Sequence, residues 1–366
     1  EEMTIYLDYN ATSPLRPEVK NAIISSLGPP SNPSSIHQYG RKAKELLESS
    51  REHIANLVGS KADNVVFTSG GTESNAMILS SAKKPLVSAI EHEAVLNSSN
   101  NPDLIKVNET GVVDLNDLDE KLKTINPDCL SIMWANNETG VIQPIKKIVE
   151  IASSYGVHIH CDAVQALGKI PINFNDSGLD SMSISGHKIG SPAGIGALIL
   201  SGEADIKPFI NGGGQEKGKR SGTENLIGAI GFGTACKTVK SELSKPNQIF
   251  IKQKDFENKI KKILKEIIII GENVPRLPNT SAVYMPFLKS DAQVILMDLN
   301  GYAISSGSAC SSGKIQSSYV LKAMGLNWAA DKTIRISSGW DNKLDDLEKI
   351  AEFYIEMYKE AKKNSA

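Results

Sequence analysis

A lysine follows a short apolar segment, in a position where it could act as a nucleophile. The segment 181–185 is typical of a buried strand and runs into the sequence Ser185-Gly186-His187-Lys188. A lysine at the end of a buried strand is unusual, because most lysines stay in water. Desolvation lowers the pKa of a lysine amine, as covalent attachment to a carbonyl compound requires. A lone lysine here would usually be a surface residue, and the neighbouring Ser185 and His187 favour a functional site.

Other strand ends carry further polar residues. The apolar segment 157–161 ends at Asp162, with Gln165 three residues later. A carboxylate that emerges from an apolar strand is costly to bury without a cationic partner, such as a protonated ring nitrogen. The alternative, that Asp162 caps a following helix, stays open. His92 could stack on an aromatic cofactor, although a single histidine is more often a hydrogen-bonded surface residue; a polar patch also occupies 136–140.

Two glycine-rich segments could bind phosphate. The predicted strand 65–68 leads into a turn with Gly71 and Thr72, where Thr72 could be the N-cap of a helix whose N-terminus suits an anion. Taken alone, this segment is more simply a capped turn. The segment 212–220 approaches a P-loop, but Arg220 stands where Mg²⁺ binding needs Ser or Thr, and no apolar strand leads into it. Nucleotide hydrolysis is therefore rejected as the main interpretation.

A cysteine lies in a small, polar, glycine-rich loop. The segment 305–313 reads Ser-Ser-Gly-Ser-Ala-Cys-Ser-Ser-Gly, and its cysteine is Cys310. An exposed cysteine on such a loop provides a thiolate that can move to meet a substrate. A neutral surface cysteine is the alternative. Cys129 and Cys161, in contrast, stand in apolar segments and are expected to be buried.

These residues need a scaffold of alternating strands and helices. Short apolar segments separated by helical patterns predict an α/β domain with a mainly parallel mixed sheet flanked by helices. Ligands of such sheets gather at the carboxyl ends of the strands, where the residues above lie. The expected strands are 65–68, 86–89, 129–134, 157–161, 181–185 and 196–200, and an expected helix is 144–154.

The C-terminal part predicts a smaller α+β domain. Its expected elements are long helices within 237–265, strands at 282–285, 303–305 and 333–336, and an amphipathic helix at 344–363. The N-terminal segment around 4–7 is expected to join this domain. The predicted organisation is a large domain of residues 12–248 and a small domain of residues 1–11 and 249–366.

Composition excludes several classes of protein. The chain has 366 residues, 40% hydrophobic and 22% charged, with a net charge of −2. This is ordinary globular usage and gives no electrostatic reason to expect nucleic acid or a membrane as partner. No apolar run approaches the ~18 residues of a membrane span, and no signal peptide is evident. Four cysteines without a CxxC pair argue against a disulfide scaffold or zinc site and predict a reducing, cytoplasmic location.

Taken together, the motifs resemble those of the cysteine desulfurases of the NifS/IscS group, in the class V branch of fold-type-I pyridoxal 5′-phosphate (PLP) enzymes. They occur in the family's order from residue 6 to about 340. The matching segments are Tyr-Leu-Asp-Tyr-Asn-Ala-Thr at 6–12, Asn-Pro-Ser-Ser-Ile-His at 32–37, Phe-Thr-Ser-Gly-Gly-Thr-Glu-Ser-Asn at 67–75, Asn-Asn-Glu-Thr-Gly at 136–140, Asp-Ala-Val-Gln at 162–165, Ser-Gly-His-Lys at 185–188, Arg-Ser-Gly-Thr at 220–223 and Ser-Ser-Gly-Ser-Ala-Cys at 305–310.

The resemblance implies a PLP-transferase-like fold and a role for each matching residue. Lys188 would hold PLP and later transfer a proton, and Asp162 would pair with the pyridinium nitrogen. Asn137 and Gln165 would bond the ring oxygen, while His92 would stack on the ring. The residues implied for the phosphate are Gly71, Thr72, Ser185 and His187.

The resemblance also implies a reaction and partners. L-cysteine would be the substrate, with its carboxylate held by Arg335 and, as a weaker candidate, by Asn32. Cys310 would attack the substrate sulfur, giving L-alanine and a persulfide that passes to an iron–sulfur scaffold or a tRNA-thiolation enzyme, with His92 among the groups that could assist. The enzyme would be a homodimer, with Thr223 reaching the phosphate of the neighbouring subunit. A selenocysteine lyase or another class V aminotransferase is the alternative, and a phosphate-binding or sulfur-relay module without PLP is a third.

Overall fold

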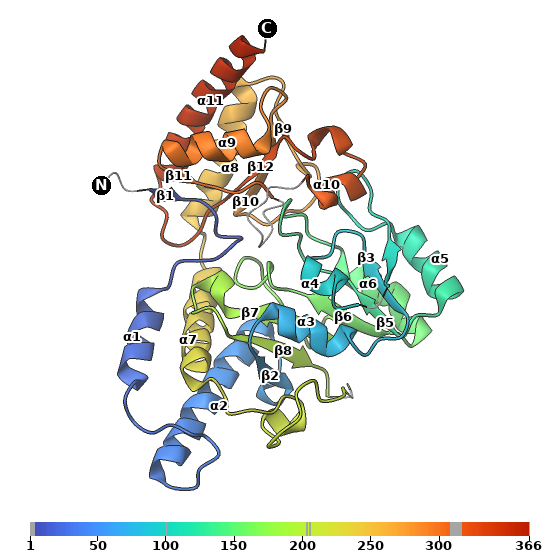
Figure 1. Cartoon of the computed structure of the whole chain (residues 1–366), viewed down its shortest axis with the longest axis vertical. Helices are drawn as coiled ribbons and strands as arrows, with labels where there is room; N and C mark the ends of the chain where they lie inside the picture. The colour runs from blue at the N-terminus through green and yellow to red at the C-terminus, as the bar shows by residue number, and fades with distance from the viewer. Residues whose placement is uncertain (1–3, 100, 203, 205, 308–316, 366) are drawn as a thin grey trace.

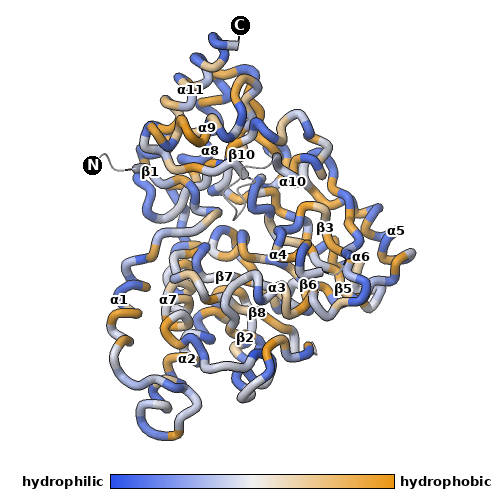
Figure 2. Tube along the Cα trace, viewed as in Figure 1, coloured by the Kyte–Doolittle hydropathy of each residue, from blue (hydrophilic) through white to orange (hydrophobic). Residues whose placement is uncertain are grey.

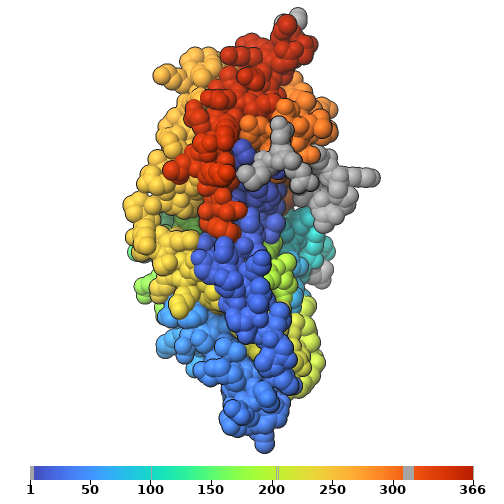
Figure 3. All heavy atoms as spheres, turned by 90° about the vertical axis from the view of Figure 1, so that its left-hand side faces the viewer, coloured from blue at the N-terminus to red at the C-terminus, as the bar shows by residue number. Residues whose placement is uncertain are grey.

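The computed structural model describes residues 4–99, 101–202, 204, 206–307 and 317–365. Figure 1 shows two lobes along the longest axis. The lower lobe holds the larger sheet and its helices, and the upper lobe holds β1, α8, α9 and α11. Figure 3 shows the N-terminal segment, in blue, passing down one face of the molecule from the upper lobe to the lower one.

The described part of the lower lobe contains a mixed seven-stranded sheet. In spatial order the strands are β2 (Val65–Thr68), β8 (Gly196–Leu200), β7 (Ser181–Ser185), β6 (His158–Asp162), β5 (Cys129–Ser131), β3 (Pro85–Ser88) and β4 (Asp103–Ile105). The pairings from β7 to β4 are parallel, whereas β8 pairs antiparallel with both β7 and β2. The carboxyl ends of β6 and β7 therefore meet at one edge, where Asp162 is in register with Ser183.

Both faces of this sheet are covered by helices, so the strands are apolar on both sides. Val66 points to the face that packs on α3 (Gly71–Leu79) and α4 (Glu93–Leu96), whereas Val65 and Phe67 point to the opposite core. The helices of that opposite core are α2 (Gln38–Val58), α5 (Leu115–Ile125), α6 (Ile145–Ala152) and α7 (Leu226–Leu243), with α1 (Pro17–Ser26) against α7. Figure 2 shows the alternation of apolar and polar residues along α1 and α2 that this packing requires.

Helix α2 packs very closely on α7 because α7 carries a glycine at the contact. A Cβ atom on Gly233 would lie 2.6 Å from the Cα of Ser50 in α2. Any larger residue would push the two helices apart, so this glycine sets how closely α7 approaches the rest of the lobe.

The upper lobe has its own core. Its sheet has β10 (Thr280–Tyr284) between β12 (Thr333–Ser337) and β9 (Ile268–Ile269), all antiparallel, and β1 (Ile5–Tyr6) pairs parallel with β11 (Tyr302–Ala303). Its helices are α8 (Gln248–Ile263), α9 (Ser290–Leu299) and α11 (Asp346–Asn364), with α10 (Tyr319–Ala323) towards the lower lobe. Leu7 of the N-terminal segment is fully buried in this core beside residues of α8 and α11.

Short 3₁₀ turns complete the chain at Ala62–Asn64, Ser153–Tyr155, Gly186–Ile189, Glu216–Gly218 and Asn327–Ala329. In the parts of the chain that the structure describes, none of the helices has the length and hydrophobicity needed to cross a membrane.

The predicted fold class is confirmed. The strands expected at 65–68, 181–185 and 196–200 coincide with β2, β7 and β8, and the expected terminal helix begins two residues late, at Asp346. The strand expected at 129–134 is wrong in length, because β5 ends at Ser131. Strands β4 and β9 were not predicted. The domain boundaries at residues 11/12 and 248/249 stay a prediction.

Candidate active site

A cavity of about 260 Å³ opens at the carboxyl ends of β6 and β7, facing the start of α3. It brings together side chains that are far apart in the sequence. The residues that line it are Gly71, Thr72, Asn75, His92, Ala94, Met133, Asn137, Asp162, Val164, Gln165, Ser185, His187 and Lys188. Nine of the residues predicted for a functional site are therefore in one place.

Lys188 stands in the 3₁₀ turn after β7, and its amine is held by main-chain carbonyl groups. Its Nζ donates to the carbonyl oxygens of Asn10 at 2.6 Å and Ala11 at 2.8 Å. Burial and the positive charge of Arg335 lower the pKa of Lys188 to about 8, although Asp8 and Asp162 oppose this. Roughly a tenth of the amine is then neutral at pH 7, which suits a nucleophile or a base.

Asp162 is the last residue of β6 and is nearly fully buried. Its Oδ2 accepts a hydrogen bond from Asn75 Nδ2 at 2.8 Å, and its Oδ1 accepts one from the backbone N–H of Val164 at 3.0 Å. Asn75 Oδ1 in turn bonds Nε2 of His160 at 2.9 Å. Burial lowers the pKa of His160 to about 3, so this histidine is neutral. The carboxylate is thus supplied with donors but has no cationic side chain bonded to it within the described residues.

The turn predicted to bind an anion lies at the start of α3, although its predicted cap is wrong. Helix α3 begins at Gly71, so Thr72 lies inside the first turn and Gly70 is the N-cap, without a side-chain cap from any described residue. A Cβ on Gly71 would lie 2.7 Å from Cγ2 of Val164, so only glycine fits beside that chain. Burial and the positive charge of Lys188 lower the pKa of His187, which also lines the cavity, to about 4, so this histidine is neutral.

Three more polar side chains face the cavity. Oδ1 of Asn137 is buried without a hydrogen-bond partner among the described residues. Gln165 is buried and donates from Nε2 to the carbonyl oxygen of Asn10 at 2.9 Å. His92 is exposed and begins α4, where its Nδ1 accepts the N–H of Ala94 at 3.1 Å.

The lining fits the group that the sequence resemblance implies. PLP carries an aldehyde, a ring nitrogen, a ring oxygen and a phosphate. The cavity offers an amine at Lys188, a carboxylate at Asp162, amide groups at Asn137 and Gln165, and an uncapped helix end at Gly71. The side-chain amide of Asn137 has an oxygen without a partner among the described residues, so this amide is available to a bound molecule.

Four predicted residues are not part of this lining. Arg335 on β12 is adjacent: its Nη1 donates to the carbonyl oxygen of Asn137 at 3.0 Å, its Nη2 to Asp8 at 2.7 Å, and its Nε is buried without a partner among the described residues. Asn32 is exposed and its side chain accepts from the N–H of Ser34. Thr223 is also exposed. Cys310 lies outside the described residues.

Sequence reasoning missed several residues of the site. Asn75 lies one helical turn after Gly71 on the same face of α3, a spacing that could have identified it. Asn10 was quoted in a motif without a role, yet it bonds Lys188, Gln165 and Lys169. Lys169 follows Gln165 by four residues, and its burial has no signature in the sequence.

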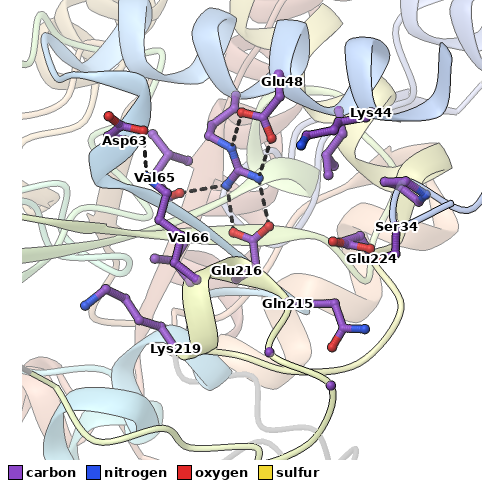
Figure 4. Close-up of a pocket in the computed structure, with 16 residues that line it drawn as sticks. Ser34, Lys44, Glu48, Asp63, Val65, Val66, Gln215, Glu216, Lys219 and Glu224 are labelled. Carbon is purple, nitrogen blue, oxygen red and sulfur yellow. Dashed lines mark hydrogen bonds and ion pairs between the residues drawn. The ribbon is translucent and has the colours of Figure 1, made fainter. Parts of the chain in front are cut away.

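A larger cavity, of about 420 Å³, lies between α2 and the segment 213–219 (Figure 4). Several of its charged groups pair with one another. The Arg51 guanidinium donates to both Glu48 and Glu216, which Figure 4 labels. Glu216 accepts from it at 2.7 and 2.8 Å and also from the backbone N–H of Phe67. Lys217 pairs with Asp63 at 2.6 Å. These contacts hold the glycine-rich segment 213–219 against the lower lobe, which argues against the P-loop interpretation.

Comparison with known proteins points in the same direction. A family model described as Aminotransferase class-V matches residues 5–350. Cysteine desulfurase IscS of Dictyoglomus turgidum is 38% identical over 361 residues, which cover 94% of this chain and 91% of that protein. A cysteine desulfurase of Gluconacetobacter diazotrophicus is 36% identical over 367 residues, with the same coverage of 94% and 91%.

Solved structures show the same fold. The X-ray structure of a NifS-like protein from Rickettsia africae superposes with a TM-score of 0.90 at 40% identity and covers 97% of this chain and 99% of the other. The structure of SspA in complex with cysteine gives a TM-score of 0.79 at 30% identity and covers 91% and 98%.

Proposed function

The chain belongs to the class-V aminotransferase family, and we propose that it is a PLP-dependent cysteine desulfurase. One observation carries the proposal. The amine of Lys188 and the carboxylate of Asp162 line one cavity at the ends of the neighbouring strands β7 and β6. The relatives at 36% and 38% identity, over almost the whole chain, carry the same activity in their names.

The cavity residues would share the parts of the cofactor among them. Lys188 would hold the aldehyde carbon, Asp162 the ring nitrogen, and Asn137 and Gln165 the ring oxygen, with His92 against the ring. When bound, PLP supplies a conjugated ring that takes up electrons released at the substrate. The residues proposed for the phosphate are Gly71, Thr72, Ser185 and His187.

The neighbouring arginine would bind the substrate carboxylate. The guanidinium of Arg335 is 5% exposed, and its Nε has no partner among the described residues. A carboxylate held there would be shielded from water, where charge-assisted bonds are strongest. Asn32 stays a weaker candidate. Lys188, with a pKa of about 8, would then move the proton at the substrate Cα.

Cys310 would accept the sulfur. Its thiolate forms a bond to the substrate sulfur while the carbon–sulfur bond breaks, and the electron pair of that bond stays on carbon and takes up a proton. L-cysteine and the Cys310 thiol thus become L-alanine and a Cys310 persulfide, which balances without an outside oxidant or reductant. An iron–sulfur scaffold or a tRNA-thiolation enzyme would receive the sulfur.

We also propose a homodimer in which Thr223 reaches the phosphate site of the neighbouring subunit. Thr223 is exposed on its own chain and is not among the residues described as lining that chain's cavity. A side chain so placed is available to a second copy. A selenocysteine lyase or another class-V aminotransferase would use the same cavity, so the test below includes both.

The deciding experiment is mass spectrometry of the intact protein after incubation with L-cysteine. We expect one added sulfur on the peptide that contains Cys310, together with L-alanine. Cys310→Ala should still bind PLP but gain no sulfur, and Lys188→Ala should lose the absorption band of bound PLP. The matched control is Cys236→Ala, because Cys236 is fully buried in α7. A wild-type chain that forms a keto acid without sulfur transfer, or that acts only on selenocysteine, contradicts the proposal.

A further inference from the structure

A second lysine is buried behind the cavity without a carboxylate beside it. Lys169 is 8% exposed, and its Nζ donates to Oδ1 of Asn10 at 2.7 Å and to Oε1 of Gln165 at 2.6 Å. No described residue forms an ion pair with it, although a buried ammonium group normally has one. Two amide oxygens are instead its partners, so Lys169 orients these side-chain amides and does not neutralise a carboxylate.

The contact with Lys169 fixes which way the Gln165 amide faces. Oε1 of Gln165 accepts from Lys169, and Nε2 donates to the carbonyl oxygen of Asn10 at 2.9 Å. If the amide were rotated by half a turn, its N–H groups would face the amine and its oxygen would face a carbonyl oxygen. Both contacts would then be repulsive, so the observed orientation is locked.

The locked orientation leaves one N–H of Gln165 for the cavity. The Nε2 group carries two hydrogens, and the carbonyl of Asn10 takes one of them. Gln165 is part of the cavity lining, so its second hydrogen is available to a bound molecule there. Without Lys169, only the carbonyl oxygen of Asn10 would orient the amide, so the flipped orientation would be less disfavoured.

The charge on Lys169 agrees with this arrangement. Burial, together with the positive charges of Lys188 and Arg335, lowers the pKa of Lys169 well below its ordinary value. The hydrogens on Nζ serve two acceptors, the side-chain oxygens of Asn10 and Gln165. The same Asn10 also receives Nζ of Lys188 on its carbonyl oxygen, so Lys169 steadies the residue that holds the nucleophile.

We propose that Lys169 is a positioning residue that locks the Gln165 amide, so that an N–H and not a carbonyl oxygen faces the ring oxygen of bound PLP. This inference rests on the proposed function. A donor at that place stabilises the deprotonated ring oxygen, whereas a carbonyl oxygen would repel it. The role requires no contact between Lys169 and the cofactor.

The test is a pH titration of the absorption spectrum of the PLP-bound protein. Lys169→Met removes the donors at similar length, and we expect the spectral midpoint to move to higher pH by about one unit, a tenfold change. Gln165→Leu should give a shift of similar size. The double variant should shift no further than either single one, because Lys169 acts through Gln165. Lys169→Gln retains one donor group, should shift less, and serves if Lys169→Met does not fold.

A matched control separates orientation from general loosening. Asn279 also bonds Oδ1 of Asn10, at 3.2 Å, but among the described residues it forms no hydrogen bond with Gln165. Asn279→Ala should leave the spectral midpoint in place. If Lys169→Met lowers the thermal midpoint and leaves the spectral one unchanged, or if the double variant shows additive shifts, the inference is overturned. A wild-type chain that binds no PLP overturns the proposed function and this inference together.

Discussion

Glu91 offers a sharp test of how the site region responds to pH. The residue is fully buried beside the cavity, and its Oε1 accepts from Oγ of Ser88 at 2.5 Å and from the backbone N–H of Met133 at 2.7 Å. Its Oε2 has no partner among the described residues. Burial, reinforced by the charge of Asp162, raises the pKa of Glu91 to about 8. The carboxyl group is therefore neutral at pH 7.

The sign and size of the effect follow from this raised pKa. Between its ordinary pKa of 4.5 and about 8, the folded protein holds a proton on Glu91 that the unfolded chain has lost. The contribution of Glu91 to the free energy of unfolding is thus greatest below pH 4.5 and falls as pH rises through that interval. At ~1.4 kcal/mol for each tenfold change, the full loss is at most about 5 kcal/mol. Glu91→Gln keeps the Oε1 acceptor and removes the titration.

The assay compares guanidinium unfolding of the two proteins at pH 5.5 and pH 9. At pH 5.5 wild type has lost about 1.4 kcal/mol of this stability, so we expect the advantage of the variant to grow by about 3 kcal/mol between pH 5.5 and pH 9. Glu52→Gln, at an exposed position of α2, is the control and should show the same difference at both pH values. Parallel behaviour of wild type and Glu91→Gln across this range would refute a neutral Glu91.

Two more predictions concern charges. Asp8→Asn removes a negative charge that raises the pKa of Lys188, so the pKa of Lys188 should fall further, by roughly half a unit. The rate at which cofactor-free protein binds PLP should then reach its half-maximum at a lower pH. An unchanged or higher midpoint pH contradicts this prediction. Arg51→Met leaves the buried Glu216 unpaired and should lower the free energy of unfolding, measured with denaturant, by about 3 to 5 kcal/mol. The control Lys42→Met removes an exposed ion pair and should lower it by under ~1 kcal/mol. Equal losses in the two variants would contradict the prediction.

Elements with a strong local pattern were predictable from the sequence. Strands β2 and β8 are mainly apolar runs, and β7 alternates serine with methionine and isoleucine; all three appear where expected. The placement of Asp162 and Lys188 at one edge followed from the rule that parallel strands end together. In contrast, β4 has two exposed residues out of three and belongs to the sheet only through its pairing with β3. The local sequence pattern does not predict such pairing.

The parts of the site that escaped prediction depend on long-range contacts. Arg335 pairs with Asp8 across 327 positions of sequence, and nothing near either residue indicates the partner. Lys169 would have been expected at the surface, since its burial depends on contact with Asn10, 159 residues earlier in the sequence. The Thr72 cap was wrong for a local reason, because α3 begins two residues earlier than that cap requires.

The amine of Lys188 rests against two peptide oxygens, those of residues 10 and 11. Every amino acid provides such an oxygen, so replacing either side chain leaves these acceptors in the chain. What determines the resting position of the nucleophile is the path taken by the backbone as it descends between the lobes. Insertions or deletions near residues 10 and 11 should therefore disturb the reactive amine more than most point substitutions there.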